Sequence, residues 1–133
     1  MTTHLFDTNT WLRACQCPEE LSPATHALLA ASREPFMLSV ISIWEVCLKV
    51  RKGKLLLTTS LDSWLSIALR PSFIRLIPID ADIARESNAL PFPFHEDPAD
   101  RLIVATARLR SLTVVTSDGK MIDYPAVKSF DTR

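Results

Sequence analysis

Short apolar segments typical of β-strands alternate with helical segments along the chain, and this alternation constrains the fold more than any other feature. The strand-like segments are 4–6, 36–40, 75–79, 112–116 and, more weakly, 126–129. The helical segments between them are 23–33, 42–52, 61–69, 80–90 and 97–110. Strands separated by helices pair in parallel, with helices on both faces of the sheet. The sequence therefore predicts a three-layer α/β/α fold with a central, mostly parallel sheet of about four or five strands.

Length and charge limit the kind of protein this can be. With 133 residues, the chain is expected to form one domain that spans 1–133 and has a single core. A formal net charge of +0 excludes a strong overall attraction for nucleic acid, so any such binding is local. The three cysteines fit neither a disulfide framework nor a zinc pattern, and no segment approaches the ~20 apolar residues that span a bilayer. These features predict a cytoplasmic protein without a membrane segment.

A helix that starts at Asp97 carries two carboxylates in different positions. Asp97 suits the N-cap and Pro98 the first helical residue, where the missing N–H costs nothing. Asp100 shares a helix face with Ile103 and Ala107, which are apolar. A carboxylate on a buried face needs a partner, a proton or a metal ion. The segment is therefore either a well-capped helix alone or one side of a site.

Two further acids each follow a strand-like segment. Asp7 follows 4–6, and Asp118 follows 112–116. Ligands bind at the carboxyl ends of the strands in open parallel sheets, so both acids are candidate site residues. Each also has a local explanation, because Asp7 or Asn9 can cap the next helix and Asp-Gly is ordinary turn chemistry.

Glu45 is the fourth acid, and taken alone it favours a structural explanation. Ser42 and Glu45 have the spacing of a capping box, in which each side chain bonds the other residue's backbone N–H at a helix start. The apolar residues of this helix lie on two sides. We therefore expect the helix to pack against the sheet and against a second surface.

All four acids are expected at one edge of the sheet, because the strands end there and the following helices begin there. Four carboxylates in one place repel one another, and a divalent metal ion stabilises them near neutral pH. Ligation by oxygen alone favours Mg²⁺ or Mn²⁺ over zinc. The chemistry that uses such a site is phosphodiester hydrolysis by a metal-activated water.

Four motifs in this order and spacing resemble those of the PIN-domain nucleases, over nearly the whole chain. The motifs are Phe6-Asp7-Thr8-Asn9, Ser39-x-x-Ser42-x-x-Glu45, Asp97-Pro98-x-Asp100-Arg101 and Val115-Thr116-Ser117-Asp118. The Asp-Pro-x-Asp-Arg form looks most like the VapC-like ribonucleases, which are the toxins of bacterial type II toxin–antitoxin pairs.

By position, the resemblance implies that four acids are catalytic and bind Mg²⁺ or Mn²⁺. These acids are Asp7, Glu45, Asp100 and Asp118. Asp97 is expected to cap the helix or support the site. The other supporting positions are Thr8, Asn9, Arg101, Thr116 and Ser117.

Two of these supporting positions leave a choice open. Arg101 can reach a phosphate or pair with Asp97. Family members often have His or Val near the position of Asn9, and the asparagine here can still form a hydrogen bond to the site.

The resemblance implies a metal-dependent endoribonuclease that is the toxin of a toxin–antitoxin system, with an RNA substrate, a homodimer and an antitoxin that blocks the site. The apolar faces of 42–52 and 61–69 suit protein partners, with ordinary core packing as the alternative. The basic residues within 49–54 can guide an RNA backbone or form a solvated face. The alternative function is a catalytically inactive PIN-like module that binds RNA or regulates.

Overall fold

The computed structural model describes residues 3–133, so residues 1 and 2 of the expected domain lie outside the described residues. The described chain contains one five-stranded sheet in the order β3-β2-β1-β4-β5, and every pair of neighbouring strands is parallel. The strands are β1 (His4–Phe6), β2 (Phe36–Ser39), β3 (Ile74–Ile77), β4 (Thr113–Thr116) and β5 (Lys128–Asp131). The α/β fold expected from the alternation is confirmed.

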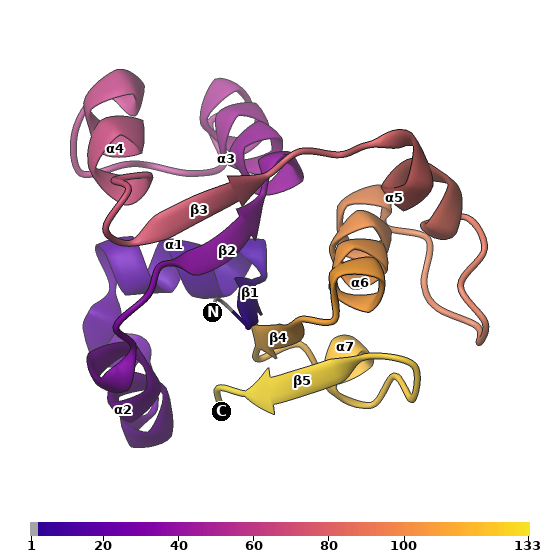
Figure 1. Ribbon diagram of the computed structural model, residues 1–133. Coiled ribbons are helices and arrows are strands. Elements are labelled where there is room, and N and C mark those ends of the chain that lie inside the picture. Colours follow the sequence, from indigo (N-terminus) through magenta and orange to yellow (C-terminus); the bar gives the residue numbers. More distant parts are fainter. Residues whose placement is uncertain (1–2) are drawn as a thin grey trace.

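Helices connect the strands and cover the sheet (Figure 1). They are α1 (Thr8–Gln16), α2 (Pro23–Ala31), α3 (Val40–Arg51), α4 (Leu61–Ala68), α5 (Ala81–Glu86), α6 (Pro98–Arg110) and α7 (Gly119–Ile122), with a 3₁₀ turn at Pro18–Glu20. Within residues 3–133, no helix has both the length and the apolar character needed to cross a membrane.

Two separate cores lie on opposite faces of the sheet, because neighbouring residues of a strand point to opposite sides. Leu5 belongs to one core, together with Ile103 of α6. Phe6 belongs to the other, together with Trp11 of α1 and Trp64 of α4. Both strand residues are fully buried, so the central strand β1 is held from two sides. Figure 1 shows α1 and α4 on one side of the sheet and α5 and α6 on the other.

The start of α3 differs from the expectation. The capping box predicted a start at Ser42, but the helix begins at Val40, directly after β2. Ser39 is the N-cap, because its backbone is extended and its hydroxyl accepts a 3.2 Å hydrogen bond from the N–H of Ile41. Ser42 and Glu45 therefore lie inside the helix, and the capping-box interpretation is wrong.

The helix predicted over 80–90 is also shorter in the structure, and it ends at Glu86. Side chains bond the carbonyl groups at this point. The hydroxyl of Ser87 donates to the carbonyl of Ala84, and the guanidinium of Arg101 donates to the carbonyl of Ser87. The side-chain amide of Asn88 also donates to the carbonyl of Ala84, so side chains satisfy carbonyls that the helix leaves without a backbone partner at its end. The short helix α7 was not expected.

The strand order places a crossing point beside β1. The chain moves outward from β1 to β2 and β3, and then returns to place β4 on the other side of β1. In open parallel sheets, ligands bind beyond the carboxyl ends of the strands where the order reverses. The ends of β1 and β4 are followed by Asp7 and Asp118, so the topology brings these two acids to this point.

Candidate metal centre

Asp7 both caps a helix and lies at the crossing point. Its backbone N–H donates to the carbonyl of Val115 in β4, at 3.2 Å. One carboxylate oxygen accepts from the N–H of Thr10 at 2.8 Å, and the other accepts from the hydroxyl of Thr116 at 2.5 Å. The side chain is buried. Asn9, the other candidate cap, is exposed on the first turn of α1.

The hydroxyl of Thr116 connects the acids that follow the two strands. It donates to Asp7 and accepts a 2.9 Å hydrogen bond from the backbone N–H of Asp118. Asp118 in turn caps α7 by accepting from the N–H of Lys120 at 2.9 Å. Because Thr116 is fully buried, this link does not depend on solvent. Each acid thus has both the capping role and the position expected of a site residue.

Thr8 holds Glu45 near Asp7. Its hydroxyl donates to a carboxylate oxygen of Glu45 at 2.5 Å and lies 2.8 Å from the hydroxyl oxygen of Ser42. Thr8 has a single hydroxyl proton, so Ser42 is the donor in the second contact. Burial raises the pKa of Glu45, and the negative charges of Asp97 and Asp7 act in the same direction, while Thr8 and Lys49 oppose them.

The N-terminus of α6 places Asp100 in the same region. Asp97 is the N-cap, as expected, and accepts from the N–H of Asp100 at 3.0 Å. An oxygen of the Asp100 carboxylate lies 3.1 Å from Nε2 of His95. His95, Asp100 and Asp118 each offer a ligand atom, and these atoms lie within 4.8 Å of one another. This trio could hold a metal ion.

The acids of the site act on one another through their charges. The pKa of Asp100 is raised to about 7, first by burial and then by the negative charges of Asp97, Asp118, Glu45 and Asp7. Asp7 and Glu45 lie outside the trio but close enough to contribute. A divalent cation would relieve this repulsion, and the donor set of carboxylates with one imidazole fits such an ion.

His95 is the residue of the trio that sequence reasoning did not assign to the site. It lies in the irregular segment before α6, where no periodicity indicates direction. The signal was its position two residues before the cap Asp97.

Arg101 has a role that neither sequence interpretation included. Its guanidinium donates to the carbonyls of Ser87 at 2.8 Å, Phe94 at 2.9 Å and His95 at 3.2 Å. These hydrogen bonds attach the segment that carries His95 to α6. In the described structure, Arg101 therefore positions the backbone beside the site.

Ser117 contacts a basic residue instead of a carboxylate. Its hydroxyl accepts from the guanidinium of Arg13 in α1, at 2.9 Å. Since Ser117 lies between Thr116 and Asp118 in the chain, Arg13 comes to the rim of the acidic site. Sequence reasoning did not assign Arg13, because a basic residue in a helix carries no signal of direction by itself.

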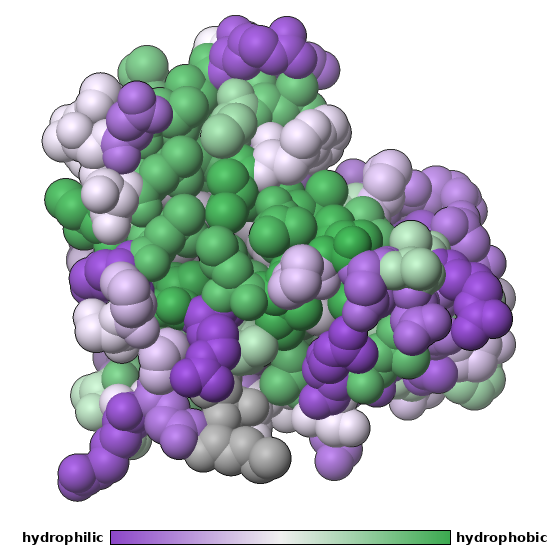
Figure 2. All heavy atoms as spheres, turned by 45° about the horizontal axis from the view of Figure 1, so that its top comes forward, coloured by the Kyte–Doolittle hydropathy of each residue, from purple (hydrophilic) through white to green (hydrophobic). Residues whose placement is uncertain are grey.

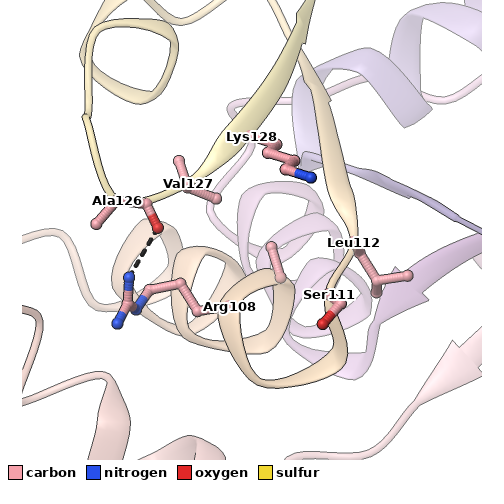
Figure 3. A pocket seen from close by; sticks show the side chains of 7 residues that line it. Arg108, Ser111, Leu112, Ala126, Val127 and Lys128 are labelled. Atoms are coloured by element: carbon pink, nitrogen blue, oxygen red, sulfur yellow. Dashed lines mark hydrogen bonds between the residues drawn. The ribbon is translucent and has the colours of Figure 1, made fainter.

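A pocket of about 260 Å³ lies elsewhere, at the C-terminal end of α6 and beside β5 (Figure 3). Arg108 crosses it and donates to the carbonyl of Ala126 at 2.8 Å. This pocket is thus at the opposite end of α6 from Asp100. A second pocket, of about 210 Å³, is lined by Trp44 and by two of the acids, Glu45 and Asp97.

The parallel sheet and the acids at its crossing point define the class of protein. The PIN domain family matches residues 5–127, and the chain belongs to this family. The resemblance inferred from the motifs is therefore confirmed at the level of the family.

Particular relatives extend this comparison. Ribonuclease VapC22 of Mycobacterium tuberculosis is 31% identical over 121 residues, which cover 91% of each chain. A DNA-bound VapBC structure from Salmonella typhimurium shares the fold with a TM-score of 0.74, at 18% identity over 100% of both chains. A toxin-antitoxin complex from Klebsiella pneumoniae has a TM-score of 0.68, at 24% identity over 97% of this chain and 99% of that chain.

Replacing Thr8 by valine should destabilise the protein, because the buried hydroxyl that bonds Glu45 is lost at nearly constant volume. We expect the free energy of unfolding in urea to fall by about 1–3 kcal/mol. Thr8→Ser keeps the hydroxyl and should lose less. Equal stability of Thr8→Val and wild type would contradict the hydrogen-bonded role of Thr8.

Replacing Asp100 by asparagine should stabilise the metal-free protein at alkaline pH. The folded-state pKa of about 7 lies above the ordinary 3.8, so ionised Asp100 opposes folding increasingly as pH rises from about 4 to 7. In EDTA, we expect the melting temperature of Asp100→Asn to exceed that of wild type by several degrees at pH 8. The difference should shrink towards pH 4, and a constant difference across this range would contradict the assignment.

Proposed function

We propose that this protein is a metal-dependent endoribonuclease, and that Asp7, Glu45, Asp100 and Asp118 hold Mg²⁺ or Mn²⁺. The observation that carries this proposal is the cluster of acids around the buried Asp7, in which burial and then the neighbouring carboxylates raise the pKa of the half-buried Asp100 to about 7. Membership of the PIN domain family and the likeness to a VapC ribonuclease support RNA as the substrate.

A divalent ion at this cluster would lower the pKa of a water molecule, so that the water could lose a proton and attack a phosphodiester. The positive charge of the ion would also stabilise the departing oxygen. Asp100 and Asp118 are the two acids of the trio, and their ligand atoms lie within 4.8 Å of each other. Asp7 and Glu45 contribute negative charge, and hydrogen bonds from hydroxyl groups orient their carboxylates. The chain thus fixes its acids before the substrate arrives.

Other residues would act on the RNA or on the acids. Thr8 and Thr116 orient carboxylates, and Asp97 fixes the start of α6. Ser117 holds Arg13, whose guanidinium has further N–H groups that can meet a phosphate. Asn9 is exposed and can face the RNA.

We also place the chain in the Asp-Pro-x-Asp-Arg subgroup of VapC-like toxins, acting in the cytoplasm beside a cognate antitoxin. The motif itself supports this, together with the toxin-antitoxin complex whose fold the chain shares. The arginine of the motif would then serve to attach the segment 91–95 to α6, as its three carbonyl contacts indicate.

Asp7→Asn and Asp100→Asn should each lower the rate of RNA cleavage by more than about 100-fold. Partners that only orient metal ligands already contribute 10- to 100-fold, so loss of a ligand charge should cost more. The measurement is cleavage of a labelled single-stranded RNA pool with Mg²⁺ or Mn²⁺. EDTA should stop the reaction, and either ion should restore it.

The matched control is Asp62→Asn, an exposed acid in the first turn of α4, which should cleave like wild type. Full activity of both site variants would contradict the proposal. Failure of the wild type to cleave RNA or bind either ion would instead favour the alternative, a catalytically inactive PIN-like module.

An apolar face offers a docking surface for protein partners. Figure 2 shows apolar residues gathered on the side that carries α3 and α4. Exposed apolar residues in and next to these helices are Trp44 of α3, Leu56 of the connection between α3 and α4, Ile67 of α4 and Leu76 of the following strand β3. An area of this kind is typical of protein–protein contacts. We propose that it binds a second copy of the chain, the antitoxin, or both.

Ile67→Glu should weaken one of these associations at least about tenfold, because it places a charge on the apolar face. Ile67 is 64% exposed, so the fold should tolerate the change. Light scattering measures self-association, and titration with the antitoxin encoded beside the gene measures the other contact. Leu109→Glu, on the last turn of α6, is the control and should leave both unchanged. If Ile67→Glu also leaves both unchanged, the face is not a docking surface.

A further inference from the structure

His95 is held rigidly beside the acids. The guanidinium of Arg101 donates to the carbonyls of His95 and of Phe94 before it. The imidazole also packs on the ring of Phe94, with 4.4 Å between the ring centroids. Only 23% of the side chain is exposed. Backbone and ring are thus both fixed, which a loop residue on the surface does not require.

The Nε2 atom of His95 points at the carboxylates without a hydrogen bond of its own. It is buried and lies 3.1 Å from an oxygen of Asp100, but the contact is not aligned as a hydrogen bond. The nearest oxygen of Asp118 completes a group within 4.8 Å. A buried polar atom without a bonded partner is costly, so a ligand at this point would satisfy it.

The other ring nitrogen accepts only a weak hydrogen bond. The backbone N–H of Asp97 donates to Nδ1 at 3.4 Å, a long bond that the ring gives up when Nδ1 carries the proton and Nε2 binds an ion. Such a weak contact does not fix the proton on Nε2. The ring can therefore carry its proton on Nδ1 and present the Nε2 lone pair to the carboxylates.

We propose that Nε2 of His95 is a ligand to the same ion as Asp100 and Asp118, and that this nitrogen makes the site prefer Mn²⁺ to Mg²⁺. This inference rests on the metal site of the proposed function and goes beyond its four acids. Mg²⁺ binds oxygen and keeps its water, whereas Mn²⁺ lies nearer the ions that imidazole suits. One nitrogen among carboxylates thus shifts the preference without excluding Mg²⁺.

The test is binding of MnCl₂ and of MgCl₂ to the full-length protein by calorimetry. We expect His95→Ala to weaken Mn²⁺ binding by at least about 10-fold and Mg²⁺ binding much less. His95→Asp restores an oxygen ligand, so it should keep both ions with a smaller preference for Mn²⁺. His26→Ala, an exposed histidine in α2, is the control and should bind like wild type.

Pulsed electron paramagnetic resonance of bound Mn²⁺ reports the nitrogen directly. We expect ¹⁴N coupling in the wild type and in His26→Ala, and no ¹⁴N coupling in His95→Asp. The His95→Asp variant keeps this test informative if His95→Ala does not fold. Mn²⁺ bound without ¹⁴N coupling in the wild type would overturn the role of His95 and leave the acidic metal site standing. No binding of either ion by the wild type would overturn the proposed function itself.

Discussion

Mutual repulsion among the carboxylates at the crossing point, of which Asp7 is buried and the others half-buried, determines what the surrounding residues must supply. Burial and the charges of its neighbours raise the pKa of Asp100 to about 7, so the acids oppose the fold at neutral pH unless something compensates. Hydroxyl groups of Thr8 and Thr116 compensate in part, by donating to Glu45 and Asp7. Such an arrangement is typical of functional sites, where stability is lost in exchange for a ligand.

The sheet supplies the rigidity that this arrangement needs. Strand β1 is fully buried at Leu5 and Phe6, which belong to different cores on opposite faces. Asp7 follows directly, and its N–H bonds β4. The position of Asp7 is therefore determined by packing on both sides of the sheet. The hydroxyl of Thr116, which bonds both Asp7 and the backbone of Asp118, fixes Asp118 relative to it.

Pattern and position in the sequence were enough to predict the sheet and the edge at which acids gather. Every expected strand is present within two residues of its predicted bounds, because strand composition and helix crossovers are local signals. The direction of Glu45 could not be predicted in this way. It depends on Thr8, which is 37 residues away in the sequence, and on Ser39 taking the cap that the pattern gave to Ser42.

The approach of His95 to the acids is also a tertiary effect, since Arg101 holds the irregular segment that carries it. The same holds for Arg13, which reaches the site only because α1 lies against the end of β4. Residues in helices and loops whose direction is set by distant partners are those that sequence periodicity misses.

Anomalous diffraction from crystals grown with Mn²⁺ shows whether these acids bind a metal ion, because it locates the ion without reference to activity. We expect an anomalous peak between Asp100 and Asp118. A well-ordered structure with no peak among these acids, or with the ion bound elsewhere, would contradict it.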